Sequence, residues 1–266
     1  MSKFATKAVI LARGLGTRMR AETPGSGLDP EQERIADTGA KALMPISNGR
    51  TLLEYILKNL SDAGFTDTCL VVGPEHYVIR EFCTKKKLDV SFAVQAEPRG
   101  TADAVLAASR NVSADRLYLV VNSDNLYPVQ SLKHLREADR PAMLAFERNS
   151  LIENSNLDQE RIGKFATVRI ESGFLKRIVE KPGSVSDDSY ISMNAWLFSH
   201  DIFDACRAIG PSERGEYEIT AAVQYAIDEL GIDFTAVRSS EGVLDLSSRV
   251  DVATVGRFLD DLDRRS

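Results

Sequence analysis

The sequence predicts an α/β fold in which a mixed, mostly parallel sheet is covered by helices on both faces. In the first half of the chain, apolar runs typical of buried strands alternate with amphipathic helical stretches. No tight hairpin signal separates these strands, so crossover connections and parallel pairing are expected. The second half contains a hairpin pattern and single strands, which predicts a smaller antiparallel region.

The first half is predicted to contain four strands and three helices. The helix at residues 51–63 is the best defined, because Thr51 and Glu54 form a capping-box pattern and Gly64 supplies a stop. Residues 21–40 are rich in Glu, Asp, Pro and Gly and lack periodicity, which predicts a long surface loop and a candidate flap. The other elements are expected as strands at 8–11, 69–72, 90–94 and 116–121, and as helices at 75–86 and 101–109, the latter capped by Thr101.

The second half is predicted to change from alternation to an antiparallel pattern. Residues 165–170 and 174–180 are separated by a Glu-Ser-Gly turn and are typical of a hairpin. We find no internal repeat, low-complexity tract or clean linker, so one continuous domain over residues 1–266 is expected. Its further elements are strands at 141–146, 191–198, 233–237 and 243–245, and helices at 217–230 and 249–263.

Composition and charge argue against several classes of protein. The net charge of −6 gives no field that would attract nucleic acid or an anionic membrane. No apolar run approaches the roughly 20 residues that span a bilayer, and the N-terminus lacks a secretory pattern. The cysteines and histidines are scattered and show no metal-ligand spacing. The unpaired pattern of the cysteines indicates reduced thiols. We therefore expect a cytoplasmic protein without nucleic-acid or membrane partners, and leave open a homo-oligomer.

Residues 11–20 follow the first apolar run and end it at a glycine pair. Gly14 and Gly16 offer bare backbone N–H groups, Thr17 a hydroxyl and Arg18 a fixed cation, which are groups that hold a polyphosphate. The loop lacks the third glycine of the dinucleotide fingerprint and the Gly-Lys-Ser/Thr of the P-loop. Lys41, four residues before Pro45, adds a second cation.

In the order of its motifs, the chain resembles the sugar-1-phosphate nucleotidyltransferases. The opening stretch from Leu11 to Arg18 is similar to the L-A-x-G-x-G-T-R signature of that family, and Lys41 to Pro45 is similar to its K-x-x-x-P step. The resemblance continues to Asp245. It implies a three-layer, Rossmann-like fold, with a nucleotide-binding half at about 1–125 and a sugar-phosphate-binding half at about 126–266.

The resemblance also implies how a nucleoside triphosphate is held. Gln95 and Gly100 resemble the pair that reads a pyrimidine, and a glutamine amide can donate and accept at once on the edge of uracil or thymine. UTP and dTTP are therefore favoured over purine nucleotides. The residues expected to bind the nucleotide are Leu11, Ala12, Gly14, Gly16, Thr17, Gln95, Gly100 and Thr101.

The resemblance assigns the residues of the remaining motifs to the binding of a sugar-1-phosphate and of Mg²⁺. Glu180 and Asn194 would bind sugar hydroxyls, Gly163 would let the sugar approach the backbone, and Lys181 would neutralise its phosphate. Two carboxylates, Asp124 and Asp245, would hold Mg²⁺. Asp124 ends a central strand, where open α/β sheets bind ligands. The glutamates of residues 215–220 are interpreted as acids at a helix N-terminus.

The sequence departs from the family pattern at several places. Arg13 stands where the family more often has Ala or Gly, and is either a tolerated surface cation or a second phosphate contact. Ser123 replaces a glycine before Asp124, and the surroundings of Asp245 lack the usual tryptophan and glycine. None of these changes removes a proposed charged group. We therefore expect activity with an altered base or sugar preference.

The reaction implied is attack by a sugar-1-phosphate oxygen on the α-phosphate of the nucleotide, with release of pyrophosphate. The nucleophile is already an anion, so catalysis by Arg18, Lys41 and Asp124 consists of positioning and charge neutralisation. Two other classes remain open. A glycosyltransferase would need an Asp-x-Asp motif, which is absent around Asp124, and a nucleotide-sugar sensor would have lost catalytic cations that are present here.

Overall fold

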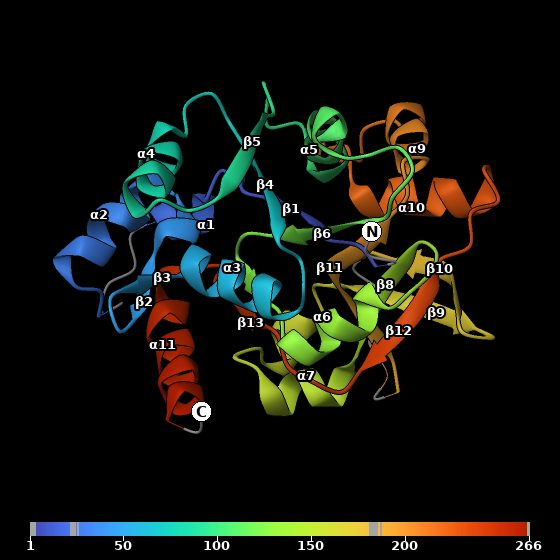
Figure 1. Cartoon of the computed structure of the whole chain (residues 1–266). Helices are drawn as coiled ribbons and strands as arrows, with labels where there is room; N and C mark the ends of the chain where they lie inside the picture. The colour runs from blue at the N-terminus through green and yellow to red at the C-terminus, as the bar shows by residue number, and fades with distance from the viewer. Residues whose placement is uncertain (1–3, 22–24, 26, 181–185, 187, 265–266) are drawn as a thin grey trace.

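The computed structural model describes residues 4–21, 25, 27–180, 186 and 188–264. Its centre is a nine-stranded sheet in the order β5-β4-β1-β6-β11-β8-β12-β10-β9 (Figure 1). Two small two-stranded sheets, β2–β3 and β7–β13, flank it. The strands are β1 Lys7–Leu11, β2 Pro45–Ser47, β3 Arg50–Thr51, β4 Asp67–Val72, β5 Val90–Val94, β6 Tyr118–Asn122, β7 Asn125–Leu126, β8 Ala142–Glu147, β9 Ala166–Glu171, β10 Phe174–Val179, β11 Tyr190–Phe198, β12 Thr235–Ser239 and β13 Leu244–Asp245.

The first four strands of the large sheet pair in parallel and end at a common edge. β1 lies between β4 and β6 and pairs in parallel with both, and β4 pairs in parallel with β5. Leu11 therefore lies opposite both Val71 and Asn122, so the loops that follow β1, β4 and β6 emerge together. This edge is the position where open α/β sheets bind ligands.

The other half of the sheet is antiparallel at every described pair except β8–β12. β11 runs antiparallel to β6, β8 and β9, and β10 runs antiparallel to β9 and β12. Because β9 pairs with β11 as well as β10, the strands β11, β8, β12, β10 and β9 form a closed ring. The sheet is thus mixed, and the expectation of a mostly parallel sheet holds for its first four strands alone, because the second half pairs mainly antiparallel. The expected hairpin at β9–β10 is confirmed.

A local irregularity lets β11 serve two parts of the sheet. Residues 190–192 pair with β9, and residues 196–198 pair with β6. The register shifts between Ser192 and Trp196, and Asn194 within this stretch has φ +57°. Asparagine tolerates this left-handed conformation better than most residues. The bend at Asn194 therefore joins the parallel half to the closed ring.

Helices cover both faces of the sheet, and each face has its own hydrophobic core. One core packs α5, α9 and α10 against side chains such as Val9 and Trp196. The other packs α3, α4 and α6 against side chains such as Ile10 and Leu70 (Figure 1). The helices are α1 Thr17–Arg20, α2 Pro30–Thr38, α3 Leu52–Asp62, α4 Tyr77–Lys86, α5 Thr101–Ala107, α6 Val129–Arg136, α7 Arg148–Asn154, α8 Gln159–Ile162, α9 Ile202–Ala208, α10 Ile219–Asp228 and α11 Arg249–Asp263.

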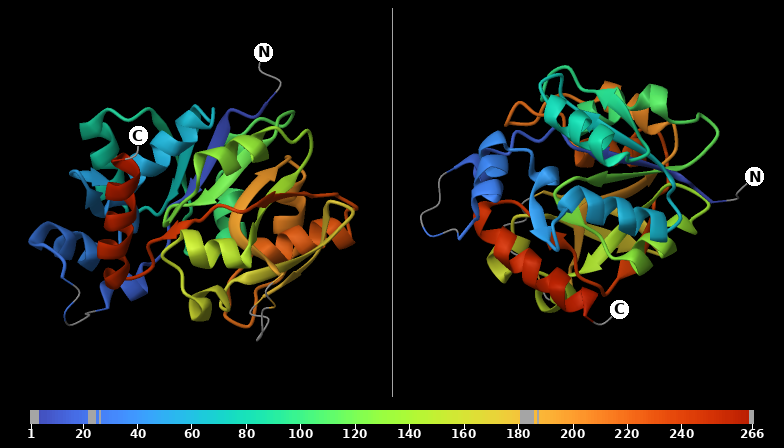
Figure 2. Two further views of the ribbon diagram at one scale, coloured as in Figure 1. Left: turned by 90° about the horizontal axis from the view of Figure 1, so that it is seen from below. Right: turned by 60° about the vertical axis from the view of Figure 1, so that its left-hand side comes forward.

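The expectation of a long loop at residues 21–40 is wrong for its second part, which forms α2. The Asp29 side chain accepts hydrogen bonds from the backbone N–H groups of Glu31 and Gln32, and the Gln32 Oε1 accepts one from the Asp29 backbone N–H. Pro30 stands at the first helical position, where it is favoured. Local capping therefore forms a helix that has little apolar periodicity. In both views of Figure 2, α11 lies beside this segment.

The expected capping by Thr101 is also corrected. Gly100 is the N-cap of α5, and the Thr101 hydroxyl instead accepts the backbone N–H of Ile219, the first residue of α10, at 2.8 Å. By contrast, the capping box of Thr51 and Glu54 at α3 is confirmed. Among the described residues, none of the helices is long and apolar enough to cross a membrane.

Candidate active site

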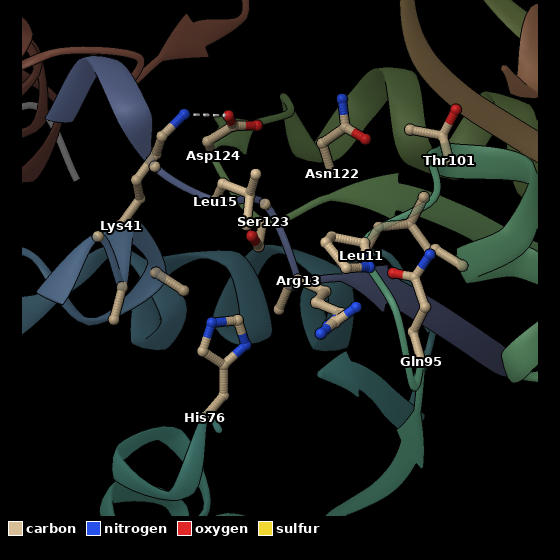
Figure 3. Close-up of a pocket in the computed structure, with 18 of the residues that line it drawn as sticks. Leu11, Arg13, Leu15, Lys41, His76, Gln95, Thr101, Asn122, Ser123 and Asp124 are labelled. Atoms are coloured by element: carbon tan, nitrogen blue, oxygen red, sulfur yellow. Dashed lines mark hydrogen bonds and ion pairs between the residues drawn. The ribbon is translucent and has the colours of Figure 1, made fainter. Parts of the chain in front are cut away.

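A cavity of about 430 Å³ opens at the edge where the parallel strands end. Its walls come from the loop after β1, from the segment after α2, and from the residues that follow β4, β5 and β6 (Figure 3). It brings together the residues predicted to bind the nucleotide and the three predicted catalytic residues. These lining residues are Leu11, Ala12, Gly14, Gly16, Thr17, Arg18, Lys41, Gln95, Gly100, Thr101 and Asp124.

The two glycines of the loop after β1 have different surroundings. Gly14 is exposed, and a Cβ built there would meet no atom of the described residues within 4 Å, so a ligand can approach its backbone. Gly16 has φ +62°, and a Cβ there would lie 2.5 Å from the Gly39 carbonyl oxygen at the end of α2. Gly16 therefore lets the loop pack against α2, while Gly14 leaves space for phosphate.

Lys41 and Asp124 form an ion pair at one end of the cavity. The Lys41 Nζ lies 2.8 Å from Asp124 Oδ2, and the two side chains are 14% and 27% exposed (Figure 3). Arg18, on α1, is exposed and makes no ion pair with the described residues. This end thus holds two cations and one carboxylate beside the open glycine backbone, an arrangement suited to a triphosphate with a divalent cation.

Asp245 lies next to Asp124 but below the cavity surface. β13 pairs with β7 so that Asp245 is opposite Asn125, and Leu246 donates its backbone N–H to the Asp124 carbonyl. Asp245 is buried, is ion-paired with Arg161, and accepts a hydrogen bond from Asn125 at 2.9 Å. Burial and the nearby charge of Asp124 raise the pKa of Asp245. The two carboxylates expected to hold a metal are therefore neighbours, with Arg161 compensating the buried one.

The orientation of the Gln95 amide is fixed by two acceptors. Its Nε2 donates to the Gly100 carbonyl at 3.0 Å and to Asp103 Oδ2 at 2.8 Å. A carbonyl and a carboxylate cannot donate, so the NH₂ group must point toward them. Gln95 therefore faces the cavity as an acceptor through Oε1. This corrects the expectation that the amide donates and accepts on the base at once.

Gly100 and Thr101 connect the end of the cavity that contains Gln95, where the nucleobase is expected, to α10. Gly100 has φ +115°, and a Cβ there would lie 2.6 Å from the Tyr217 carbonyl oxygen, so this position requires glycine. Ala102 donates to that same carbonyl at 2.8 Å. Glu216 lines the cavity, whereas the interpretation from sequence treated it as an ordinary helix-terminal acid.

Three of the residues predicted on the sugar side, Gly163, Glu180 and Asn194, lie outside this cavity. Gly163 ends α8, Glu180 is exposed after β10, and Lys181 falls outside the described residues. Asn194 lies at the bend of β11, beside Met193, whose carbonyl accepts the Tyr127 hydroxyl at 2.6 Å. That hydroxyl also lies 3.4 Å from the Asn125 side chain, which bonds Asp245. Of these residues, Asn194 is thus connected to the carboxylate pair.

Sequence reasoning missed several residues that line the cavity, among them His76, Asn122 and Ser123. His76 is buried at the start of α4, and its Nδ1 accepts the Gly73 backbone N–H at 3.1 Å. Burial, with the positive charges around it, lowers its pKa. A histidine after a glycine-proline turn carries no distinctive sequence signal, so only the fold reveals its position.

Arg13 is not the surface cation that the sequence left as one of two alternatives. It is only 7% exposed, lines the cavity, and pairs with Glu75 through Nη2 at 3.1 Å. Its Nε and Nη1 are buried and have no hydrogen-bond partner among the described residues.

The sequence model of the nucleotidyl transferase family matches residues 7–246. The chain belongs to this family. It is 30% identical to a glucose-1-phosphate thymidylyltransferase of Streptomyces antibioticus, over 97% of this chain and 68% of that protein. It is 28% identical to the UTP–glucose-1-phosphate uridylyltransferase AglF of Haloferax volcanii, over 90% of each chain. A second thymidylyltransferase, from Streptomyces griseus, is 30% identical, and the chain spans 66% of its length.

Solved structures share this nucleotidyltransferase's fold. A UDP-glucose pyrophosphorylase in complex with UDP-glucose superposes with a TM-score of 0.74 at 18% identity, covering 97% of this chain and 99% of that one. An inositol-1-phosphate CTP transferase from T. maritima gives a TM-score of 0.72 at 16% identity, covering 97% and 96%. Both have mixed α/β architecture, which agrees with the mixed sheet described above.

Proposed function

We propose that this nucleotidyltransferase transfers the nucleotidyl group of UTP or dTTP to a sugar-1-phosphate, releasing pyrophosphate. The observation that carries the proposal is the cavity itself, which has cations and a carboxylate at one end and a locked amide acceptor at the other. A triphosphate complements the charged end, and a base with an imino N–H donates to the amide acceptor at the other end. The names of the relatives make glucose-1-phosphate the first acceptor to test.

The chain's own residues would act by positioning two anions. Arg18 and the open backbone at Gly14 would hold the triphosphate, and Lys41 would neutralise charge at the α-phosphate. The sugar phosphate oxygen is already a nucleophile, so no general base is required. Lys181, Glu180, Gly163 and Asn194 remain the proposed sugar-phosphate residues.

The donor set fits a magnesium ion at Asp124, and Asp245 would join it by exchanging a present partner, because its Oδ1 accepts from Asn125 and its Oδ2 from Ser247 and Arg161. Asp124 pairs with Lys41 through Oδ2 alone among the described contacts, which leaves Oδ1 for a metal. The raised pKa of Asp245 reflects its burial and the adjacent Asp124, and a divalent cation would relieve the repulsion between the two carboxylates. One or two carboxylates with phosphate oxygens and water make a normal Mg²⁺ shell. Bound there, Mg²⁺ would neutralise phosphate charge; Asp124 and Asp245 would hold it.

Pyrophosphate release from each nucleoside triphosphate, with and without a panel of sugar-1-phosphates, tests the proposal. We expect release with UTP or dTTP and a sugar-1-phosphate, and its loss when EDTA removes Mg²⁺. Arg18→Ala and Asp124→Ala should each lower the rate on the order of 10²- to 10³-fold. Arg34→Ala, an exposed arginine on α2 outside the cavity, is the matched control.

Three results would contradict parts of this assignment. Turnover within a few-fold of the wild type in both Arg18→Ala and Asp124→Ala would refute the roles of these residues. A clear preference for ATP or GTP would refute the base assignment through Gln95. Nucleotide-sugar binding without any pyrophosphate release would indicate the sensor instead of the enzyme.

A further inference from the structure

Arg13 has an unmet hydrogen-bonding capacity at the wall of the cavity. Among the contacts of the described residues, only Nη2 of its guanidinium is paired, with both oxygens of Glu75 at 3.1 and 3.2 Å. Nε and Nη1 are buried without a partner among the described residues, although the side chain is 6% exposed. Burying such donors unpaired costs desolvation energy that an acceptor in the cavity would recover. The site is therefore built to receive an acceptor at Arg13.

The position of Arg13 places that acceptor at the base end of the cavity. A Cβ built on Gly73, just after β4, would lie 2.5 Å from Arg13 Nε. The residue before Gly73, Val72, accepts the backbone N–H of Gln95 at 3.0 Å. Arg13 and Gln95 thus flank the same strand end, and Figure 3 shows the Arg13 head between His76 and Gln95, away from the Lys41–Asp124 pair.

Gln95 and Arg13 offer complementary halves of one hydrogen-bonding pattern. Gln95 presents only an acceptor, because its NH₂ group is bound to Gly100 and Asp103. Arg13 presents only donors. Uracil and thymine carry an imino N–H donor directly beside a carbonyl acceptor, which matches this pair.

We propose that Arg13 is a specificity-determining residue that donates to a carbonyl oxygen of the nucleobase, while Gln95 accepts from the adjacent imino N–H. The inference rests on the proposed function only in taking the ligand to be UTP or dTTP. It replaces both alternatives left by the sequence, a surface cation and a second phosphate contact. Asp103 supports the same pattern as a positioning residue, since it holds the Gln95 NH₂ group away from the base.

Equilibrium binding separates contact with the base from contact with the phosphates. The affinities of wild type and Arg13→Ala are measured for inorganic tripolyphosphate and for whichever of UTP and dTTP binds the wild type more tightly. We expect Arg13→Ala to weaken nucleotide binding about ten- to a hundred-fold, as for loss of a charge-assisted hydrogen bond. Tripolyphosphate binding should stay within twofold. Arg80→Ala is the control, because Arg80 donates to Gly73 O at 3.2 Å but does not line the cavity.

A nucleotide analogue tests the same contact in the unaltered protein, whether or not Arg13→Ala folds. Two analogues serve, 4-thio-UTP and 2-thio-UTP, each of which keeps the imino N–H and replaces one carbonyl oxygen by sulfur, a weaker hydrogen-bond acceptor. One of the two should bind the wild type about tenfold more weakly than UTP. In folded Arg13→Ala, that sulfur substitution should make little further difference, because the two changes weaken the same hydrogen bond.

The outcomes are distinct. Equal losses for nucleotide and tripolyphosphate would make Arg13 a phosphate contact, and no loss for either would limit it to holding Glu75; both overturn the inference. Undiminished affinity for both thio analogues overturns it as well. Base-dependent binding without any pyrophosphate release would instead refute the proposed reaction, and it would still support the contacts of Arg13 and Gln95 with the base.

Discussion

At the scale of single residues, two ion pairs of equal geometry have different expected roles. Lys41 Nζ lies 2.8 Å from Asp124, and Lys7 Nζ lies 2.8 Å from Asp67; both lysine side chains are 14% exposed. Lys7 begins β1, at the end of the strand opposite to the cavity, whereas Lys41 lines the cavity. The equal N–O distance and equal lysine exposure make Lys7 a control for the removal of one ion-paired lysine.

We predict that Lys41→Ala lowers the rate of pyrophosphate release on the order of 10²- to 10³-fold, as expected for loss of a preorganised cation near developing charge. Lys7→Ala should leave the rate unchanged, since it removes only an ion pair far from the cavity. The rates are measured at saturating nucleotide and sugar phosphate, with thermal melts to confirm folding. Equal rates in the two variants would show that the Lys41–Asp124 pair serves structure alone.

The charged residues of the cavity could be predicted from sequence, but the hydrogen-bonding state of their neighbours could not. Arg18, Lys41 and Asp124 stand in motifs whose order along the chain is informative, and the structure brings them to one cavity. The locked amide of Gln95 depends on Asp103, in the first turn of α5, and the burial of Arg13 depends on Gly73 after β4. Such facts arise from tertiary packing, which no local pattern records.

At the scale of elements, α2 and α11 illustrate a contact between distant segments. Arg249, at the start of α11, is 3% exposed and donates through Nε to the Met19 carbonyl at 2.9 Å. It also pairs with Asp37 at 2.7 Å and with Glu33, both on α2. Because Met19 follows Arg18 on α1, Arg249 connects α2 and α11 to the loop expected to hold the triphosphate.

We predict that Arg249→Met raises KM for the nucleoside triphosphate roughly tenfold or more, because small displacements of positioning groups have large kinetic effects. The variant should also have a lower Tm, since it leaves the Met19 carbonyl and the two carboxylates of α2 without their partner. Arg257→Met is the matched control. Arg257 lies on the same helix, is exposed, and bonds only Thr254 at 3.2 Å among the described contacts.

Steady-state kinetics with the nucleotide varied checks this prediction. An unchanged KM in a folded Arg249→Met protein would contradict the idea that α11 positions the loop after β1. An equal rise in KM for Arg257→Met would show that the effect comes from the overall charge of α11 and not from the contacts of Arg249.

The elements with a strong sequence signal were predicted, and those held by capping or by distant partners were not. α3 combines apolar periodicity with a capping box, and it begins within one residue of its predicted start. α2 has the signal Asp29-Pro30-Glu31-Gln32, a capping box with proline at the first position, but lacks an apolar stripe. Weighting periodicity above capping therefore led to the prediction of a loop.

At the scale of the whole molecule, the closure of the second half of the sheet could not be predicted. The hairpin β9–β10 is local and was expected, whereas pairing of β9 with β11 and of β12 with β8 joins strands distant in sequence. The pairing of β9 with β11 uses residues 190–192, just before the bend at Asn194. A three-layer arrangement could thus be inferred from alternating elements, while the ring required knowledge of non-local register.

The two faces of the sheet have separate cores, and each contains a buried tyrosine with a different hydroxyl environment. Tyr118 packs with Phe198 and Phe203 in one core, and its hydroxyl has no hydrogen-bond partner among the described residues. Tyr127, in the other core, donates its hydroxyl to the Met193 carbonyl at 2.6 Å. The same substitution should therefore have opposite effects in the two cores.

We predict that Tyr118→Phe raises the free energy of unfolding by about 1 kcal/mol, because it removes an unpaired buried hydroxyl and keeps the ring. Tyr127→Phe should lower it by about 1–3 kcal/mol, because the Met193 carbonyl loses its donor. Denaturant unfolding at neutral pH measures both. Destabilisation by Tyr118→Phe would mean that its hydroxyl is hydrogen-bonded, and would contradict this account of its core.

The difference in stability between Tyr118→Phe and the wild type should also depend on pH, in a direction that the pKa of Tyr118 defines. Burial raises the pKa of Tyr118 well above 10, so the folded state keeps a proton that the unfolded chain releases near pH 10. The unfolded state therefore binds fewer protons above that pH, and stability falls as pH rises. Tyr118→Phe lacks this group, so its stability advantage over the wild type should widen between pH 9 and 11. An advantage that stays constant over this range would show that Tyr118 ionises equally in both states.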